Sequence, residues 1–282
     1  MKNISGLLQL YRIDSFLITI FSFFVTLIIT NYGKIDGPAV FLGISLGVVF
    51  VNFIYSINSY YDADIDAINK PYRPLPSGKI TKSLAKKYIG VLGLLSITLP
   101  LVFWHHTSLL IALYSFPVLG ILYSNPFYPL KKKAWMATLL TTIIVVLPAT
   151  LAIIYTEQIE KYFSYVGIIF GYCFCMVPLK DIEDVKGDLA YKSENWAHKV
   201  GEKKLTHFSF IGLITLSATA FVYRDINGFI LLSGVFACSA IVELYFLRRN
   251  ISLARLYKAL ILTNLVLLLT GFIGYFFQKV VS

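Results

Sequence analysis

The sequence predicts an all-α integral membrane protein with nine transmembrane helices. Of its 282 residues, 57% are hydrophobic and only 14% are charged, whereas soluble domains carry roughly 25% charged residues. Its apolar runs reach the length of about 20 residues that a helix needs to cross a bilayer. Basic residues gather between alternate runs, as they do in membrane proteins with several spans. Together these three observations define the fold class.

Nine apolar runs follow one another along the chain. They cover roughly residues 15–33, 37–57, 85–104, 107–124, 136–156, 163–179, 205–223, 228–247 and 257–277. Backbone groups inside a bilayer must be satisfied within the segment, so runs of this length predict helices. The strict alternation typical of a membrane β-barrel is absent from them. No Gly/Ser-rich linker interrupts the series, so we expect a single membrane domain over residues 1–282.

The basic residues predict how the spans are oriented. If the N-terminus is cytoplasmic, every Lys and Arg falls on the cytoplasmic side except Lys34, Lys161, Arg224 and Lys279. This is the positive-inside pattern. It predicts a protein of the cytoplasmic (inner) membrane with its C-terminus outside. The net charge of +10 is explained by this bias, so we expect membrane lipids, and no nucleic acid, among the partners.

Polar residues at a spacing of four follow the second span, at Asn58, Asp62 and Asp66. Residues i and i+4 share one face of a helix, so this spacing predicts a stripe of one amide and two carboxylates. Like charges so placed repel each other, and a bound divalent cation removes the repulsion. The loop that follows holds three prolines and a glycine between Asn69 and Lys79, which exclude a continuous helix.

The same spacing recurs after the sixth span, at Lys180, Asp184 and Asp188, with Asp181 close to Asp184. Charge at a membrane boundary is costly unless it is solvated, paired or metal-bound, which makes both clusters functional candidates. The recurrence predicts two related helical hairpins that face a shared cavity. We expect residues 180–204 to form a long loop over that cavity.

Two facing stripes of hard oxygen ligands predict a magnesium site. Mg²⁺ typically joins one or two carboxylates to the phosphates of a substrate. The candidate metal ligands are Asn58, Asp62, Asp66, Asp181, Asp184 and Asp188. The candidate basic residues for the bound anion are Lys70, Arg73, Lys131, Lys180 and Lys186. Arginine suits bidentate contact with phosphate.

In combination, these motifs resemble the UbiA superfamily of intramembrane prenyltransferases. The resemblance rests on Asn58–Asp66, on Asn-Lys-Pro-Tyr-Arg-Pro-Leu-Pro-Ser-Gly at 69–78, on Asp181–Asp188, and on the Tyr123–Pro126 segment ahead of Lys131. The first motif is similar to those of chlorophyll synthases and archaeal digeranylgeranylglyceryl phosphate synthases. The resemblance extends over nearly the whole chain.

The resemblance implies nine helices around a central cavity, with a cytoplasmic cap formed by the loops after helices 2, 4 and 6. It implies Mg²⁺-dependent transfer of an isoprenyl group, geranylgeranyl or similar, from an isoprenyl diphosphate to a lipophilic acceptor. That acceptor is an aromatic or quinone precursor, a prenylated glycerol phosphate or a chlorophyllide-like molecule. The implied catalytic residues are Asp62, Asp66, Asp184 and Asp188. Asn58, Lys70, Arg73, Tyr123 and Lys131 are implied to contact the diphosphate.

Two other functions stay open at this point. A membrane terpene cyclase of the same superfamily would ionise the diphosphate without an acceptor, and a cation transporter would use the carboxylates along its path. The acceptor is also open, because two segments depart from the usual family pattern. These segments, 12–14 and 194–198, are candidates for bordering the acceptor.

Overall fold

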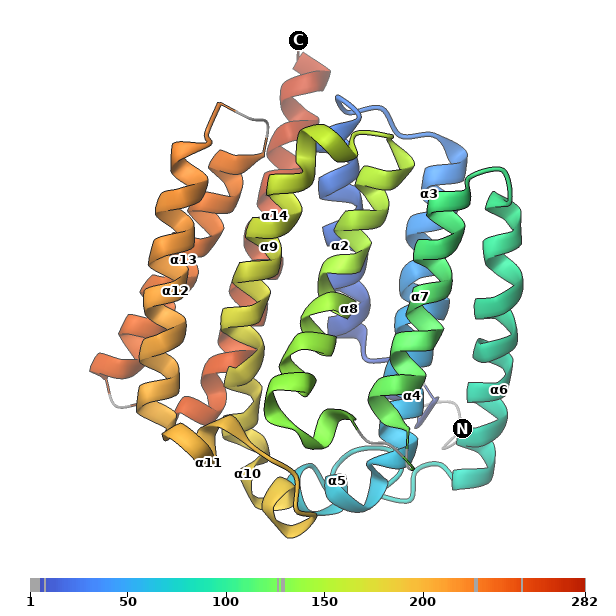
Figure 1. Cartoon of the computed structure of the whole chain (residues 1–282), viewed down its shortest axis with the longest axis vertical. Coiled ribbons are helices and arrows are strands. Elements are labelled where there is room, and N and C mark those ends of the chain that lie inside the picture. Colours follow the sequence, from blue (N-terminus) through green and yellow to red (C-terminus); the bar gives the residue numbers. More distant parts are fainter. Residues whose placement is uncertain are drawn as a thin grey trace. The chain divides into compact units, whose positions relative to one another are not determined.

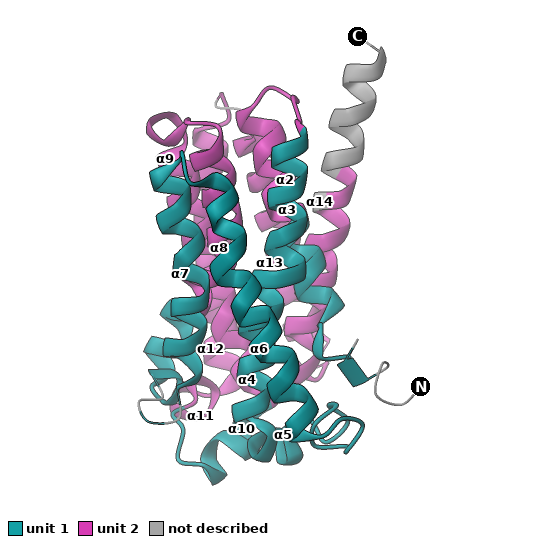
Figure 2. Cartoon of the chain, turned by 90° about the vertical axis from the view of Figure 1, so that its right-hand side faces the viewer, with its two compact units in different colours: residues 1–20, 37–140, 184–194 teal, residues 21–36, 141–183, 195–282 magenta. Residues whose placement is uncertain are grey.

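The computed structural model describes residues 6–7, 9–125, 127, 130–225, 228–249 and 251–281, without the side chains of 268 and 271–281. All regular secondary structure within this part of the chain is helical (Figure 1). The chain divides into two compact units, coloured separately in Figure 2. Three helices pass from one unit into the other: α2 (Ile13–Thr30), α8 (Ala134–Tyr155) and α10 (Asp181–Ala190).

The first unit comprises residues 1–20, 37–140 and 184–194. Its own elements are α3 (Gly37–Ser45), the π-helical η1 (Leu46–Val51), α4 (Asn52–Tyr61), α5 (Ala63–Asn69), α6 (Lys82–Thr98), the 3₁₀ segment η2 (Leu99–Phe103), α7 (Thr107–Ser124) and the 3₁₀ turn η3 (Leu130–Lys132).

Helix α4 is the centre of this unit, because it packs against both α6 and α7. The rings of Phe50 and Phe116 lie 5.7 Å apart between centroids. Next to them, a Cβ at Gly120 of α7 would lie 2.8 Å from Ile54 Cγ1. The glycine therefore permits the close helix approach that membrane interfaces favour, and it brings α7 against α4 one turn before Asn58 of the first acidic motif.

The second unit comprises residues 21–36, 141–183 and 195–282. Its own elements are α9 (Ile159–Met176), the 3₁₀ segment η4 (Val177–Lys180), α11 (Trp196–Val200), α12 (Glu202–Val222), α13 (Phe229–Arg248), the 3₁₀ turn η5 (Leu253–Arg255) and α14 (Leu256–Val281). Helices α12 and α13 pair along their length, and α13 also contacts α14. Tyr172 stacks on Phe236 with 4.3 Å between ring centroids, which ties α9 to α13.

Eight helical segments in the described part of the chain are long and apolar enough to cross a membrane. They are Ile13–Thr30, Gly37–Tyr61, Lys82–Phe103, Thr107–Ser124, Ala134–Tyr155, Ile159–Ala190, Glu202–Val222 and Phe229–Arg248. These segments confirm the first eight predicted spans. The ninth falls in α14, where the side chains of 268 and 271–281 lie outside the described residues, so that span stays a prediction. So do the central cavity and the cap.

The prediction of a long loop over residues 180–204 is wrong. Helix α9 continues through η4 into α10, which ends at Ala190, and α11 and the start of α12 occupy much of the rest. Pro178 stands in the first turn of η4, where the helix takes 3₁₀ geometry between α9 and α10. The second acidic motif therefore lies on a helix.

Candidate functional site

The first acidic motif straddles a break between α4 and α5. Asp62 ends α4 and begins α5 with non-helical backbone angles of φ −91° and ψ 6°. The N–H of Asp62 nevertheless donates to the carbonyl oxygen of Asn58 at 2.9 Å, and that of Asp66 donates to the carbonyl of Asp62 at 2.7 Å. The break therefore preserves the spacing of four on which the predicted stripe depends.

The proline-rich loop after α5 is anchored by apolar packing within the first unit. Leu10, Ile80 and Ala85 form a buried cluster, against which Leu75 and Tyr88 also pack. The loop turns tightly, with the N–H of Arg73 donating to the Lys70 carbonyl at 3.0 Å. This anchored loop carries Lys70 and Arg73, the side chains that pair with Asp184 and Asp66.

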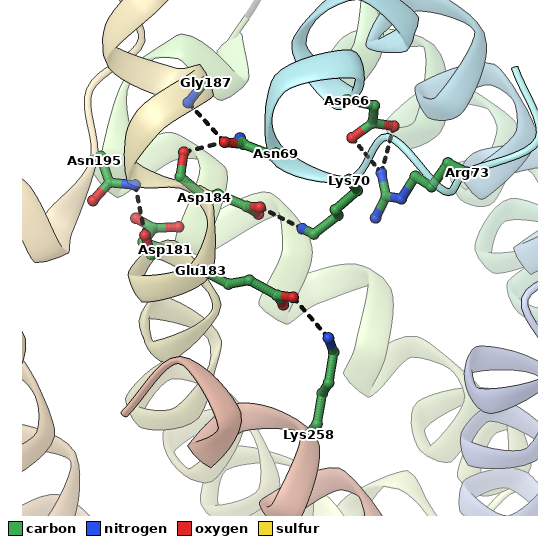
Figure 3. A network of polar contacts seen from close by, with 10 residues as sticks. All are labelled: Asp66, Asn69, Lys70, Arg73, Asp181, Glu183, Asp184, Gly187, Asn195 and Lys258. Carbon is green, nitrogen blue, oxygen red and sulfur yellow. Dashed lines mark hydrogen bonds and ion pairs between the residues drawn. The ribbon is translucent and has the colours of Figure 1, made fainter. Parts of the chain in front are cut away.

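Three ion pairs join the acidic motifs to basic residues, all within the first unit. The two Asp66 oxygens accept from Nη1 of Arg73 at 2.6 and 2.5 Å, and Asp184 accepts from Lys70, as Figure 3 shows. Lys131, on η3, donates to Asp62 and at 3.0 Å to Oδ1 of Asn58. Each of the three pairs is at least three-quarters buried. The structure thus gathers the first motif, Asp184 of the second motif, the loop and Lys131.

Burial changes the electrostatics of this cluster. It raises the pKa of Asp66 above the usual value, and the adjacent Arg73 guanidinium offsets this only in part. Asp64 is different, because its side chain is 71% exposed and reaches Lys82 only at 3.6 Å. Exposed pairs of that kind contribute little to stability. Asp64 is therefore a natural control for its two buried neighbours.

Asn69, the last residue of α5, joins the two motifs through the backbone of α10. Its Nδ2 donates to the carbonyl of Asp184 at 2.9 Å, and its Oδ1 accepts from the N–H of Gly187 at 2.7 Å (Figure 3). A Cβ at Gly187 would collide with the Asn69 side chain. Asn69 and Gly187 thus form a latch, the Asn69 latch, between the first motif and the second.

Glu194, six residues beyond Asp188, attaches the segment after the second motif to the segment that carries Lys131. Its N–H donates to the Lys132 carbonyl at 2.8 Å, and its Oε2 accepts from the N–H of Ala134, the first residue of α8, at 3.1 Å. A carboxylate at a helix N-terminus is stabilised by the unpaired N–H groups and the helix dipole. This departure from the family pattern therefore has a local structural role within the first unit.

The predicted ligand Asp181 lies in the second unit and supports the start of α11. Its Oδ2 accepts from the N–H of Trp196 at 3.0 Å, and its carbonyl accepts from Nδ2 of Asn195 at 2.8 Å; Figure 3 includes the second contact. Lys180, in the same unit, donates to Thr141 Oγ1 at 3.5 Å. Their roles toward a metal or diphosphate stay predictions.

The remaining predicted site residues lie on α10 and near the end of α7. Asp188 is partly buried on α10 and Lys186 is exposed there. Tyr123 is near the end of α7, with its ring centroid 5.7 Å from Nζ of Lys131. Pro126 of the quoted Tyr123–Pro126 segment lies outside the described residues. Each proposed contact of these residues with a diphosphate stays a prediction.

The donor set of the first unit fits magnesium shared with a substrate. Among the described residues, no three His, Cys, Asp or Glu side chains come together as a metal-binding group. Mg²⁺ commonly uses only one or two carboxylates, completing its octahedron with water and substrate phosphates. The carboxylates of Asp62, Asp66 and Asp184 match that requirement in chemistry, and the basic partners match the phosphates.

Sequence reasoning missed the structural roles of three residues that organise the cluster: Asn69, Gly187 and Glu194. A glycine inside a helix costs about 1 kcal/mol relative to alanine, and its presence in α10 is a signal of close approach by another group. Nothing in the spacing around Asn69 or Glu194 identifies their partners, which lie far away in the sequence.

The spans and the paired motifs define an integral membrane protein with a charged, largely buried site. The chain belongs to the UbiA prenyltransferase family, whose sequence profile matches residues 17–266. It is therefore a prenyltransferase of the membrane, as its motif resemblance predicts.

Individual relatives show the same relationship. The chain is 29% identical over 282 residues to a digeranylgeranylglyceryl phosphate synthase of Sulfurisphaera tokodaii, covering 95% of this chain and 98% of that protein. It is 36% identical over 95 residues to the chloroplastic chlorophyll synthase of Arabidopsis thaliana, covering 32% of this chain and 24% of that one. A solved UbiA homologue from Archaeoglobus fulgidus, bound to GPP and Mg²⁺, matches the fold with a TM-score of 0.72 at 16% identity, over 95% of this chain and 98% of that one.

Proposed function

We propose that this prenyltransferase moves an isoprenyl group from an isoprenyl diphosphate to a lipophilic acceptor, with Mg²⁺ as cofactor. The observation that carries the proposal is the cluster of three largely buried ion pairs, Asp62 with Lys131, Asp66 with Arg73 and Asp184 with Lys70. It supplies carboxylates for metal and cations for phosphate from one compact unit.

Each side chain of the cluster has a role that follows from its charge. Lys70, Arg73 and Lys131 bind diphosphate oxygens, Arg73 through its planar guanidinium. The carboxylates they release hold the metal, together with Asn58 and Asp188 by position in the motifs. When bound, Mg²⁺ neutralises charge on the leaving diphosphate as a Lewis acid.

The proposed reaction breaks the bond between the allylic carbon and the diphosphate oxygen, and the electron pair leaves with the diphosphate. A hydroxyl oxygen of the acceptor then forms the new bond to that carbon and loses its proton to the departing diphosphate or to water. The fixed cations of Lys70, Arg73 and Lys131 stabilise the charge that develops on the leaving group, which lowers the barrier to ionisation.

A prenylated glycerol phosphate is the first acceptor to test. The support is the near full-length likeness to a digeranylgeranylglyceryl phosphate synthase, whereas the likeness to chlorophyll synthase covers only a third of the chain. We propose geranylgeranyl diphosphate as the donor on the same ground.

The test uses purified protein in detergent with labelled geranylgeranyl diphosphate, Mg²⁺ and a panel of acceptors, followed by mass spectrometry of the product. We expect a prenylated glycerol phosphate to be extended, and chelation of Mg²⁺ to abolish turnover. Asp62→Asn and Asp184→Asn should each lose most diphosphate release, whereas Asp64→Asn, on the exposed side of the same motif, should retain it. Undiminished turnover in both buried variants contradicts the proposal, and a cyclic product formed without acceptor indicates a terpene cyclase.

A further inference from the structure

A groove between α12 and α13 in the second unit combines basic and apolar side chains. Its volume is about 310 Å³. Three basic residues, Lys203, His207 and Arg248, line it together with three apolar residues, Phe210, Leu244 and Leu247. Neither the predicted metal site nor the proposed transfer reaction uses any of them.

The two kinds of side chain are separated along the helices. Lys203 stands in the first turn of α12 and Arg248 is the last residue of α13, so both lie where a span ends. Phe210 lies two turns further into α12, and Leu244 one turn further into α13. Lys203 and Arg248 therefore lie at the membrane boundary, next to Leu247, while Phe210 and Leu244 lie deeper and His207 lies between the two levels.

A buried hydrogen bond holds the two helices beside the groove. Ser209 Oγ donates to Oε1 of Glu243 at 2.8 Å, and these residues are 3% and 0% exposed. Ser209 precedes the groove residue Phe210, and Glu243 precedes Leu244. The helix spacing at the groove is thus fixed by contacts inside the protein, and the groove is preformed.

The two charged residues of the groove, Lys203 and Arg248, have no acidic partner in the described part of the chain. Glu243 is directed to Ser209 instead. The surrounding surface is apolar, with Ile211 of α12 and Ile241 of α13 61% and 65% exposed. A ligand that carries an anionic group on a hydrocarbon chain would complement both the basic and the apolar side chains of the groove.

We propose that this groove binds one anionic phospholipid of the bilayer. Its phosphate lies among Lys203, His207 and Arg248, and the first part of an acyl chain covers Phe210, Leu244 and Leu247. Basic pockets between spans at the membrane surface recognise anionic lipid headgroups by this combination of charge and apolar contact. The proposal does not depend on the function proposed above, because the groove residues are separate from the acidic cluster.

The test measures lipid retention by the full chain, purified in detergent and depleted of lipid. Native mass spectrometry counts bound molecules after addition of phosphatidylglycerol, phosphatidylcholine or inorganic phosphate. We expect one retained phosphatidylglycerol for the wild-type chain and for Lys204→Ala/Arg249→Ala. Lys203→Ala/Arg248→Ala should bind it about thirtyfold more weakly, since each basic side chain near an anionic surface contributes roughly fivefold.

The paired variants separate a defined site from general surface charge. They remove the same charge from adjacent positions at the same helix ends, and only one pair lines the groove. Equal loss in both double variants overturns the proposal, as does equal retention of phosphatidylcholine or binding of inorganic phosphate alone. If Lys203→Ala/Arg248→Ala does not fold, Leu244→Trp fills the groove without changing charge, and it should displace the lipid; full retention by that variant also overturns the proposal.

Discussion

Lys131 is the residue on which the first acidic motif most directly depends. It contacts both Asn58 and Asp62, with 15% of its side chain exposed. Removing one partner of a buried pair leaves the other charge uncompensated, which is usually more costly than the pair is stabilising. The side chain thus links local stability to the proposed binding of the diphosphate.

We therefore expect Lys131→Ala to reduce kcat/KM for the isoprenyl diphosphate by about 100- to 1,000-fold, the usual effect of losing one charge-stabilising donor. Diphosphate release at varied substrate concentrations measures this. Lys133→Ala, which removes an exposed charge two residues away, should stay close to wild type. Similar losses in both variants would show that only the net charge of the segment matters.

Gly187 tests the Asn69 latch. In an ordinary helix interior, replacing glycine with alanine stabilises by up to about 1 kcal/mol. Here the new Cβ collides with Asn69, so we expect Gly187→Ala to lower both the melting temperature and the activity. Gly90→Ala is the matched control, because nothing lies within 4 Å of a Cβ at that position in α6; a stabilising effect at both positions would exclude the latch.

At the scale of elements, α8 begins where three parts of the first unit meet. Glu194 accepts from the first N–H of α8, η3 carries Lys131 directly before it, and the backbone of Glu194 pairs with Lys132. Glu194 is therefore a positioning residue for Lys131, acting through the helix start rather than by contact with a substrate.

We expect Glu194→Ala to lower stability by roughly 0.5–1 kcal/mol, the usual value of a side chain at a helix N-terminus. It should also raise KM for the diphosphate more than it lowers kcat, because Lys131 becomes less well placed. Glu194→Gln keeps an acceptor oxygen and should restore most of the KM. Loss of kcat alone, or no rescue by glutamine, would assign Glu194 another role.

The acidic elements show what sequence patterns can predict. The spacing of four correctly predicts that Asn58, Asp62 and Asp66 follow one another by helical turns, because that geometry is local. The break of the helix at Asp62 and the Asn69 latch depend on packing between segments far apart in sequence. No local pattern carries that information. Within residues 180–204, by contrast, the spacing of four at Lys180, Asp184 and Asp188 is local and agrees with helix α10.

At the scale of the whole molecule, hydrophobicity predicts eight of the spans well, since the bilayer imposes a minimum length on each apolar run. The carboxylates of Asp62, Asp66 and Asp184 and their three basic partners fall in the same compact unit, which hydrophobicity alone does not indicate. The orientation of the spans in the membrane is a separate prediction, because it depends on the distribution of charge outside them.

We expect a cysteine at position 133 to be accessible from the cytoplasm and one at position 224 from the opposite side. The native Cys173, Cys175 and Cys238 are first replaced by alanine, which leaves a single reactive thiol in Lys133→Cys or Arg224→Cys. A membrane-impermeant maleimide applied to right-side-out and inverted vesicles measures the labelling. Labelling of both positions from the same side would overturn the predicted topology.

The pairing of Asp62, Asp66 and Asp184 with cations has a consequence for selectivity. A free anion that binds Lys70, Arg73 and Lys131 leaves three carboxylates uncompensated, and a free metal ion that binds the carboxylates leaves three cations uncompensated. Only a ligand that brings both charges together preserves neutrality. We therefore expect the resting cluster to bind the metal–diphosphate complex more tightly than an inorganic anion or a metal ion alone.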